Sequence, residues 1–131
     1  MSSKAQSIHG ITMNMLEDAP SLKHLFPQLK KILNKKTVVI YNANYDVRLL
    51  VQTMQQDEIT DKANLHAECA MLAYSQFIGE LASFKDDYKW QKLSGGDHSA
   101  IGDCRATINV IKEMANTELK EIPKKWYQFR N

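Results

Sequence analysis

Cysteine, proline and glycine are scarce in this sequence of 131 residues, which contains 2, 3 and 5 of them, respectively. These numbers exclude a disulfide scaffold and a collagen-like chain. Cys69 and Cys104 belong to no CxxC pair, so we expect reduced thiols in a cytoplasmic protein. A secretory signal is absent, and no run of about 18 apolar residues occurs that could cross a membrane. We therefore expect a soluble protein with no membrane partner.

An excess of one charge is also lacking. The 17 Lys and Arg residues against 15 Asp and Glu residues leave a formal charge of +2, whereas a strongly basic face would usually raise it further. The balance neither requires nor excludes nucleic-acid binding. Apolar residues make up 44% of the chain, as in a globular domain, and no repeat or linker-like stretch interrupts it. The sequence thus predicts a single domain over residues 1–131.

Helical patterns alternate with one clear strand. Residues 37–41 form a mostly β-branched run without polar alternation, which predicts a central strand buried on both faces. We expect a helix capped by Ser21 before this strand, ending at Asn34, and a second helix directly after it, from Asn44. A strand that leads into a helix is half of a βαβ unit, so the pattern favours an α/β fold.

Shorter sequence patterns lie before and after this helix–strand–helix segment. Gly10 is expected to end any preceding helix, and Thr12 to cap a short helix. A helical pattern runs over residues 66–78 and closes at Gly79, and a last long helix should start near Gly102. Its apolar face should carry Ile108, Ile111 and Met114. Both cysteines are interpreted as buried helix residues and Trp90 as a core anchor on a short turn of helix, rather than as a base-stacking platform. We interpret residues 118–131 as an edge segment or docked tail.

Two groups of residues can carry chemistry. Asp46 lies in the first turn of the helix that follows the strand, where ligands gather in open α/β sheets. An acid there also complements the helix dipole, which is the structural alternative. His98 and Asp103 lie five residues apart around the start of the last helix, where an imidazole can accept a proton and a carboxylate can hold a divalent cation. Taken alone, this second pair also has a structural reading.

The motif blocks together resemble a known family. Residues 41–50 (YNANYDVRLL) and 98–107 (HSAIGDCRAT), preceded by 8–12 (IHGIT) and 15–20 (MLEDAP), are similar to the DEDDh 3′–5′ exonuclease superfamily. Its members include exonuclease X, ribonuclease T and the proofreading subunit of the bacterial replicative polymerase. The resemblance implies a ribonuclease H-like fold and hydrolysis of phosphodiesters at single-stranded DNA or RNA 3′ ends by two Mg²⁺ or Mn²⁺ ions.

The resemblance also implies roles for individual residues. Asp103 matches a direct metal ligand, Asp46 the acid that supports the metal centre partly through water, and His98 the general base. Nucleic-acid contacts are expected from Asn42, Asn44, Arg48 and His9. For His9, a turn that ends a helix is the structural alternative.

One family motif is missing from the sequence. The family's D-x-E motif lies upstream of the HGIT block, yet only seven residues precede Ile8 here, and none forms that motif. We therefore expect an N-terminally truncated fold with a reduced sheet, weak metal binding and impaired or absent hydrolysis. The alternative is a non-catalytic remnant that binds nucleic acid or protein. An exposed edge at residues 38–40 should favour self-association, a partner chain, or coverage by the N-terminal residues.

Overall fold

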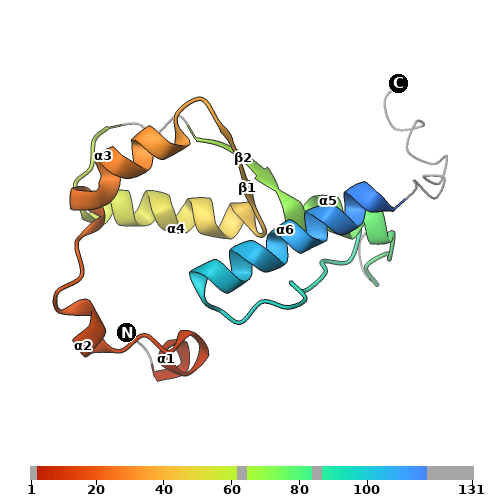
Figure 1. The fold of residues 1–131 in the computed structure, drawn as a ribbon, viewed down its shortest axis with the longest axis horizontal. Coiled ribbons are helices and arrows are strands. Elements are labelled where there is room, and N and C mark those ends of the chain that lie inside the picture. The colour runs from red at the N-terminus through yellow and green to blue at the C-terminus, as the bar shows by residue number, and fades with distance from the viewer. Residues whose placement is uncertain (1–2, 62–64, 84–86, 118–131) are drawn as a thin grey trace.

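The computed structural model of the chain describes residues 3–61, 65–83 and 87–117. In chain order the elements are α1 (Ser3–His9), α2 (Met13–Leu16), α3 (Leu22–Leu33), β1 (Thr37–Ile40), α4 (Ala43–Gln56), β2 (His66–Cys69), α5 (Ala70–Ile78) and α6 (Ala100–Asn116) (Figure 1). The interpretation of residues 118–131 lies outside the described residues.

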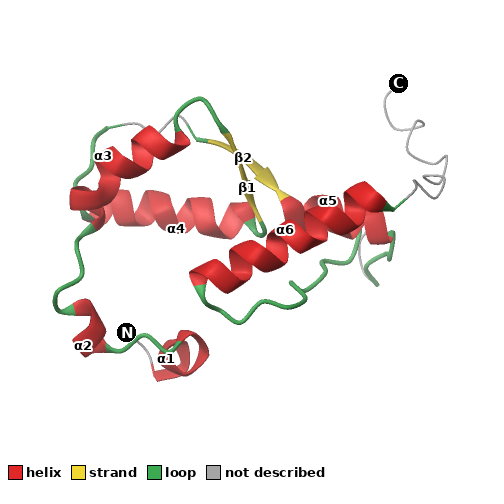
Figure 2. Cartoon of the chain, viewed as in Figure 1, coloured by secondary structure: helices red, strands yellow, loops and turns green. Residues whose placement is uncertain are grey.

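A two-stranded parallel sheet lies at the centre (Figure 2). The strands pair from Thr37 opposite His66 to Ile40 opposite Cys69. Helix α4 connects them and packs against both, α5 contacts β1, and α6 packs on α5. The expected α/β fold with a reduced sheet flanked by helices is confirmed.

The sheet is covered on one face only, so the prediction of a strand buried on both faces is wrong. Both strands alternate between exposed and half-buried residues, with Thr37 and Val39 on the uncovered face and Val38 and Ile40 on the other. Val39 remains 46% exposed although it is β-branched and lies in the middle of β1. No described helix packs over its side of the sheet, and no described strand pairs with the other edge of β1.

The buried core is small and is formed by residues of α3, α4, α5 and α6 on the covered side of the sheet, where α4 and α5 contact the strands. Its apolar members are Phe26, Ala43, Ala70, Met71, Ala106 and Val110. The predicted apolar face of α6 is partly wrong, because Ile108 is 49% exposed while Ala106 and Val110 face the core. Small residues there allow α6 to approach α5 closely.

Local sequence signals account for most helix ends. The hydroxyl groups of Thr12 and Ser21 accept hydrogen bonds from the backbone of the first turns of α2 and α3, as predicted. Gly79 ends α5 in the left-handed conformation, with φ of 75°. The expected helix over residues 66–78 begins only at Ala70.

Residues 66–69 are a strand because their backbone pairs with β1, and this long-range pairing overrides a local helical pattern. The interpretation of both cysteines as buried helix residues is therefore wrong: Cys69 is half-buried in β2, and Cys104 is exposed on α6. Both are free thiols, as expected.

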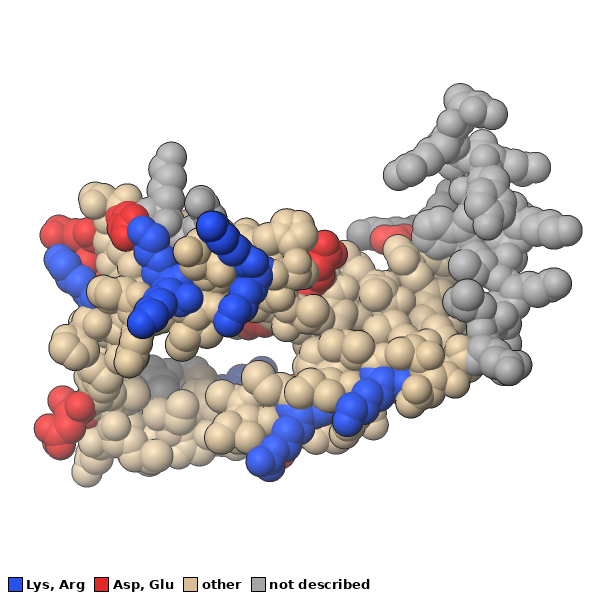
Figure 3. Space-filling model, turned by 45° about the horizontal axis from the view of Figure 1, so that its top comes forward, with Lys and Arg blue, Asp and Glu red and all other residues tan. Residues whose placement is uncertain are grey.

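The N-terminal helices form an arm that packs little on the rest of the molecule. Apolar side chains on α1 and α2 stay exposed, among them Ile8, Met13, Met15 and Leu16. The space-filling view shows an opening between the α3 side and the α6 side of the molecule (Figure 3). Residues 3–20 form no strand, so they do not pair with the edge of β1. No helix within the described ranges is long and apolar enough to span a membrane.

Candidate active site

Asp46 lies in the first turn of α4, just beyond the carboxyl end of β1. Asn42 caps this helix, and its side-chain oxygen accepts a hydrogen bond from the backbone N–H of Tyr45 at 3.4 Å. The pKa of Asp46 is raised, first by partial burial and then by the negative charge of Asp103. The carboxylates of Asp46 on α4 and Asp103 on α6 therefore lie within electrostatic range of each other.

Asp103 is half-buried in the first turn of α6. Its Oδ1 accepts a hydrogen bond from the backbone N–H of His98 at 3.1 Å, so the carboxylate is directed back towards the preceding loop. Gly96 leaves room for this arrangement, because a Cβ atom there would lie 2.7 Å from the same oxygen. The structure thus brings Asp46, Asp103 and the backbone of His98 together, although the roles expected of them stay predictions.

His98 lies in a short loop that several hydrogen bonds hold in place. Asp97 accepts hydrogen bonds from the Ser99 hydroxyl at 2.7 Å and from its backbone N–H at 2.9 Å, and these bonds lower the pKa of Asp97. Ser99 in turn caps α6 by accepting from the backbone of Gly102 at 3.0 Å. His98 is exposed and adopts a φ of 62°, a conformation that few residues other than glycine favour.

The donor set at this site is too small for a complete metal centre. Carboxylate oxygens are the ligands that Mg²⁺ and Mn²⁺ prefer. Across the described residues, however, no group of three or more His, Cys, Asp or Glu residues could hold a metal ion. Asp46 and Asp103 would leave most coordination positions of a hard cation to water. The residues present therefore do not by themselves fit a two-metal site.

A pocket of about 240 Å³ opens on another side of the start of α4. It is lined by Asn42, Asn44, Tyr45, Arg48, Cys69, Met71, Leu72 and Trp90. The guanidinium carbon of Arg48 lies 5.5 Å from the centre of the Tyr45 ring, which indicates a cation–π contact. No carboxylate lines this pocket.

Three of the four residues expected to contact nucleic acid meet in this pocket: Asn42, Asn44 and Arg48. His9 does not line it. It ends α1, and its Nδ1 accepts a hydrogen bond from the backbone N–H of Ile11 at 3.0 Å, which fits the alternative of a helix-ending turn.

Trp90 also lines this pocket, and its interpretation as a core anchor on a helical turn is wrong. It is 64% exposed on a segment without helix. A large aromatic residue among the polar residues Lys89, Gln91 and Lys92 is the only sequence signal that could have indicated exposure.

Comparison with known proteins places the chain in a family. The exonuclease family model of the RNase T type matches residues 1–111. An uncharacterized exonuclease of Escherichia phage 186, CP81, is 35% identical over 128 residues, covering 86% of this chain and 66% of that protein. The chain belongs to the exonuclease family, with a ribonuclease H-like fold, and to the DEDDh superfamily that its motifs resemble.

More distant relatives are larger proteins. The PolC-type DNA polymerase III of Thermotoga maritima is 29% identical over 134 residues, which cover 95% of this chain and 10% of that polymerase. RNA exonuclease 4 of Candida glabrata is 25% identical over 120 residues, covering 92% and 45%, respectively. The chain thus spans just under two thirds of the phage protein and one tenth of the polymerase. No solved structure matches the chain.

Proposed function

We propose that residues 1–131 act as one exonuclease domain on single-stranded nucleic-acid 3′ ends, with Asp46, Asp103 and His98 as its catalytic residues. The observation that carries the proposal is the approach of two carboxylates from α4 and α6 at the carboxyl end of β1. Family membership supports it, because exonucleases generally use divalent metals at carboxylate sites. His98 sits next to Asp103, and an imidazole readily exchanges a proton at neutral pH.

We infer that hydrolysis by this chain alone is impaired. Two carboxylates give a hard cation a weak site, and loss of groups that act together commonly lowers rates by orders of magnitude. Slow digestion that needs a high Mn²⁺ concentration is the expected behaviour.

Digestion of a 3′-labelled single-stranded oligonucleotide over a Mn²⁺ titration tests this proposal. The parent chain should release label slowly, and Asp103→Ala should abolish release, whereas Glu17→Ala on the N-terminal arm should not change it. Titration calorimetry should show heat of Mn²⁺ binding that Asp103→Ala removes. Absence of digestion at high Mn²⁺ contradicts the enzymatic function of this chain, and digestion that persists in Asp103→Ala contradicts the assigned site.

A binding module is the second candidate, and the pocket near Arg48 favours it. Its lining offers a cation, amide groups and aromatic rings without needing a metal. Binding of a fluorescent oligonucleotide in EDTA, without digestion at any Mn²⁺ concentration, would support this alternative over the enzyme.

We propose in addition that a second copy of the chain pairs with the free edge of β1. The exposed Val39 and the edge left unpaired by the described strands support this, since such edges invite added strands. Light scattering after size-exclusion chromatography should show a dimer that Val39→Lys disrupts. A folded monomer at all concentrations contradicts it.

A further inference from the structure

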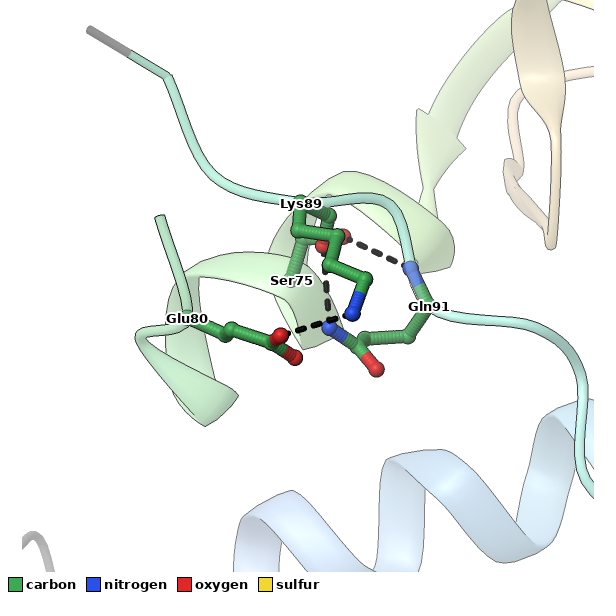
Figure 4. A network of polar contacts seen from close by, with 4 residues as sticks. All are labelled: Ser75, Glu80, Lys89 and Gln91. Carbon is green, nitrogen blue, oxygen red and sulfur yellow. Dashed lines mark hydrogen bonds and ion pairs between the residues drawn. The ribbon is translucent and has the colours of Figure 1, made fainter. Parts of the chain in front are cut away.

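Trp90 is held in place by its neighbours while its own side chain stays exposed. Lys89 bonds to Glu80 through both its backbone N–H, at 2.8 Å to the carbonyl, and its Nζ, at 2.6 Å to Oε1. Gln91 donates its backbone N–H to the buried Ser75 hydroxyl at 3.4 Å (Figure 4). The Gln91 carbonyl accepts from the Tyr41 hydroxyl at 2.9 Å. The backbone on both sides of Trp90 is therefore fixed, with no need to order it when a ligand binds.

The pocket beside Trp90 has the chemistry of a nucleobase site. Two aromatic residues, Trp90 and Tyr45, line it together with Met71 and Leu72, which gives a largely apolar wall. Asn44 supplies amide donors and acceptors, and Arg48 supplies a positive charge. Its volume of about 240 Å³ is below the range of drug-sized ligand pockets, which suits one flat ring better than a larger molecule.

We propose that this pocket is a subsite that stacks one unpaired nucleobase on Trp90, while Arg48 contacts the adjoining phosphate. The subsite is separate from the carboxylate pair, because none of Asp46, His98 and Asp103 lines it. It accepts any base, since aromatic stacking uses the π-face that all bases share. The proposal rests on the proposed nucleic-acid substrate and names a position on the protein where the strand is held without metal.

The charges of the two regions favour an anionic strand here over a cationic or apolar partner. The pocket lining contains one cation and no carboxylate, so a phosphate can approach it. The Asp46 and Asp103 pair repels a phosphate unless a cation lies between them. A strand bound in the absence of divalent ions should therefore be held by the Trp90 pocket.

The test uses the full chain in EDTA, with Trp126→Phe so that Trp90 is the only tryptophan. A dT oligomer should quench Trp90 fluorescence, and an abasic oligomer with the same number of phosphates should not. In anisotropy measurements with labelled oligomers, Trp90→Ala should weaken dT binding about tenfold and leave abasic binding unchanged. Trp90→Phe should keep most of the affinity. Leu81→Ala, a matched control at a residue 68% exposed, should change neither.

Several outcomes overturn the proposal. If Trp90→Ala binds dT as tightly as the parent, or weakens both oligomers equally, the subsite is wrong while the exonuclease proposal stands on its digestion assay. If the parent binds neither oligomer, the subsite and the proposed substrate both fail. If Trp90 emission shifts with protein concentration alone, a second copy occupies the pocket. Thermal melting of Trp90→Ala should match the parent, because the exposed ring adds little to the fold.

Discussion

The two sides of the first turn of α4 differ in their charge and in the hydrogen bonds that hold them in place. On one side, Asp46 lies within electrostatic range of Asp103, and the two acids raise the free energy of bringing a phosphate near. On the other, Tyr45 and Arg48 face a pocket without acids. The catalysis proposed for the first side would depend on a cation and on further ligands, whereas the binding proposed for the second would depend on neither. The two proposals therefore predict that holding a strand and cutting it are physically separable in this chain.

The two sides are also stabilised differently. The acidic side is built on the loop at residues 96–99, whose bonds are internal or made to the start of α6. The pocket side is held by a bond between distant segments, because the Tyr41 hydroxyl just after β1 donates to the Gln91 carbonyl. Burial raises the pKa of Tyr41, so this donor stays protonated. Substitutions that act on one side should leave the other intact.

Among substitutions that act on one side only, Gly102→Ala on the acidic side should have the largest effect on the free energy of unfolding. A Cβ atom at this position collides with the Asp97 carboxylate, which Ser99 holds in place. Alanine normally favours a helix over glycine, yet here the free energy of unfolding should fall by about 1–3 kcal/mol. Urea unfolding followed by circular dichroism measures it.

Ile101→Ala, at the neighbouring exposed position of α6, is the control and should be close to neutral. Oligonucleotide binding in EDTA should be unchanged in Gly102→Ala. A variant as stable as the parent would show that Asp97 moves freely and that the acidic side is not rigid.

Loss of the α6 cap should have the next largest effect. Ser99→Ala removes the acceptor for the Gly102 N–H and a donor to Asp97, so we expect a loss of about 1–2 kcal/mol. Thr12→Ala removes the same kind of cap from α2, on the loosely packed arm, and should cost less than about 0.5 kcal/mol. Chemical denaturation of both variants compares them. Equal losses would mean that the arm unfolds together with the body.

Arg48→Ala should act on the pocket side alone. In EDTA it should weaken both dT and abasic oligomers several-fold and lower the slope of log affinity against log salt by about one, because one phosphate contact is lost. Arg105→Ala, an exposed arginine on α6, is the control. An unchanged salt slope in Arg48→Ala would place the phosphate contact elsewhere.

The sequence predicts this fold well where local signals and tertiary packing agree. Ser21 and Gly79 mark helix ends because capping depends on one or two neighbouring residues. Residues 66–69 were misjudged because their strand exists only through pairing with β1. Val39 was expected to be buried because β-branched runs usually fill central strands, and nothing local reports that one face is left uncovered.

The candidate site also contains residues that the sequence could locate and one whose exposure it could not predict. Asp46 and Asp103 could be located from motif spacing, since each lies in the first turn of a helix that begins where the sequence predicts. The exposure of Trp90 could not, because it depends on Ser75 and Tyr41, which hold the adjacent backbone against the fold from elsewhere in the chain.

The smallest expected effect concerns the ionised Asp46 carboxylate, whose pKa is raised first by partial burial and then by the charge of Asp103, and its sign follows from that direction. A carboxyl whose pKa is higher in the folded state than its ordinary value of 3.8 destabilises the fold as pH rises through that interval. Without divalent ions, Asp46→Asn should therefore melt slightly higher than the parent at pH 7, by less than about 3 °C, and the gain should vanish once the pH falls below 3.8. Glu17→Gln on the arm is the control. A gain that persists at low pH would contradict ionisation of Asp46 as its source. Added Mn²⁺ should stabilise the parent more than the variant, because only the parent keeps both acids.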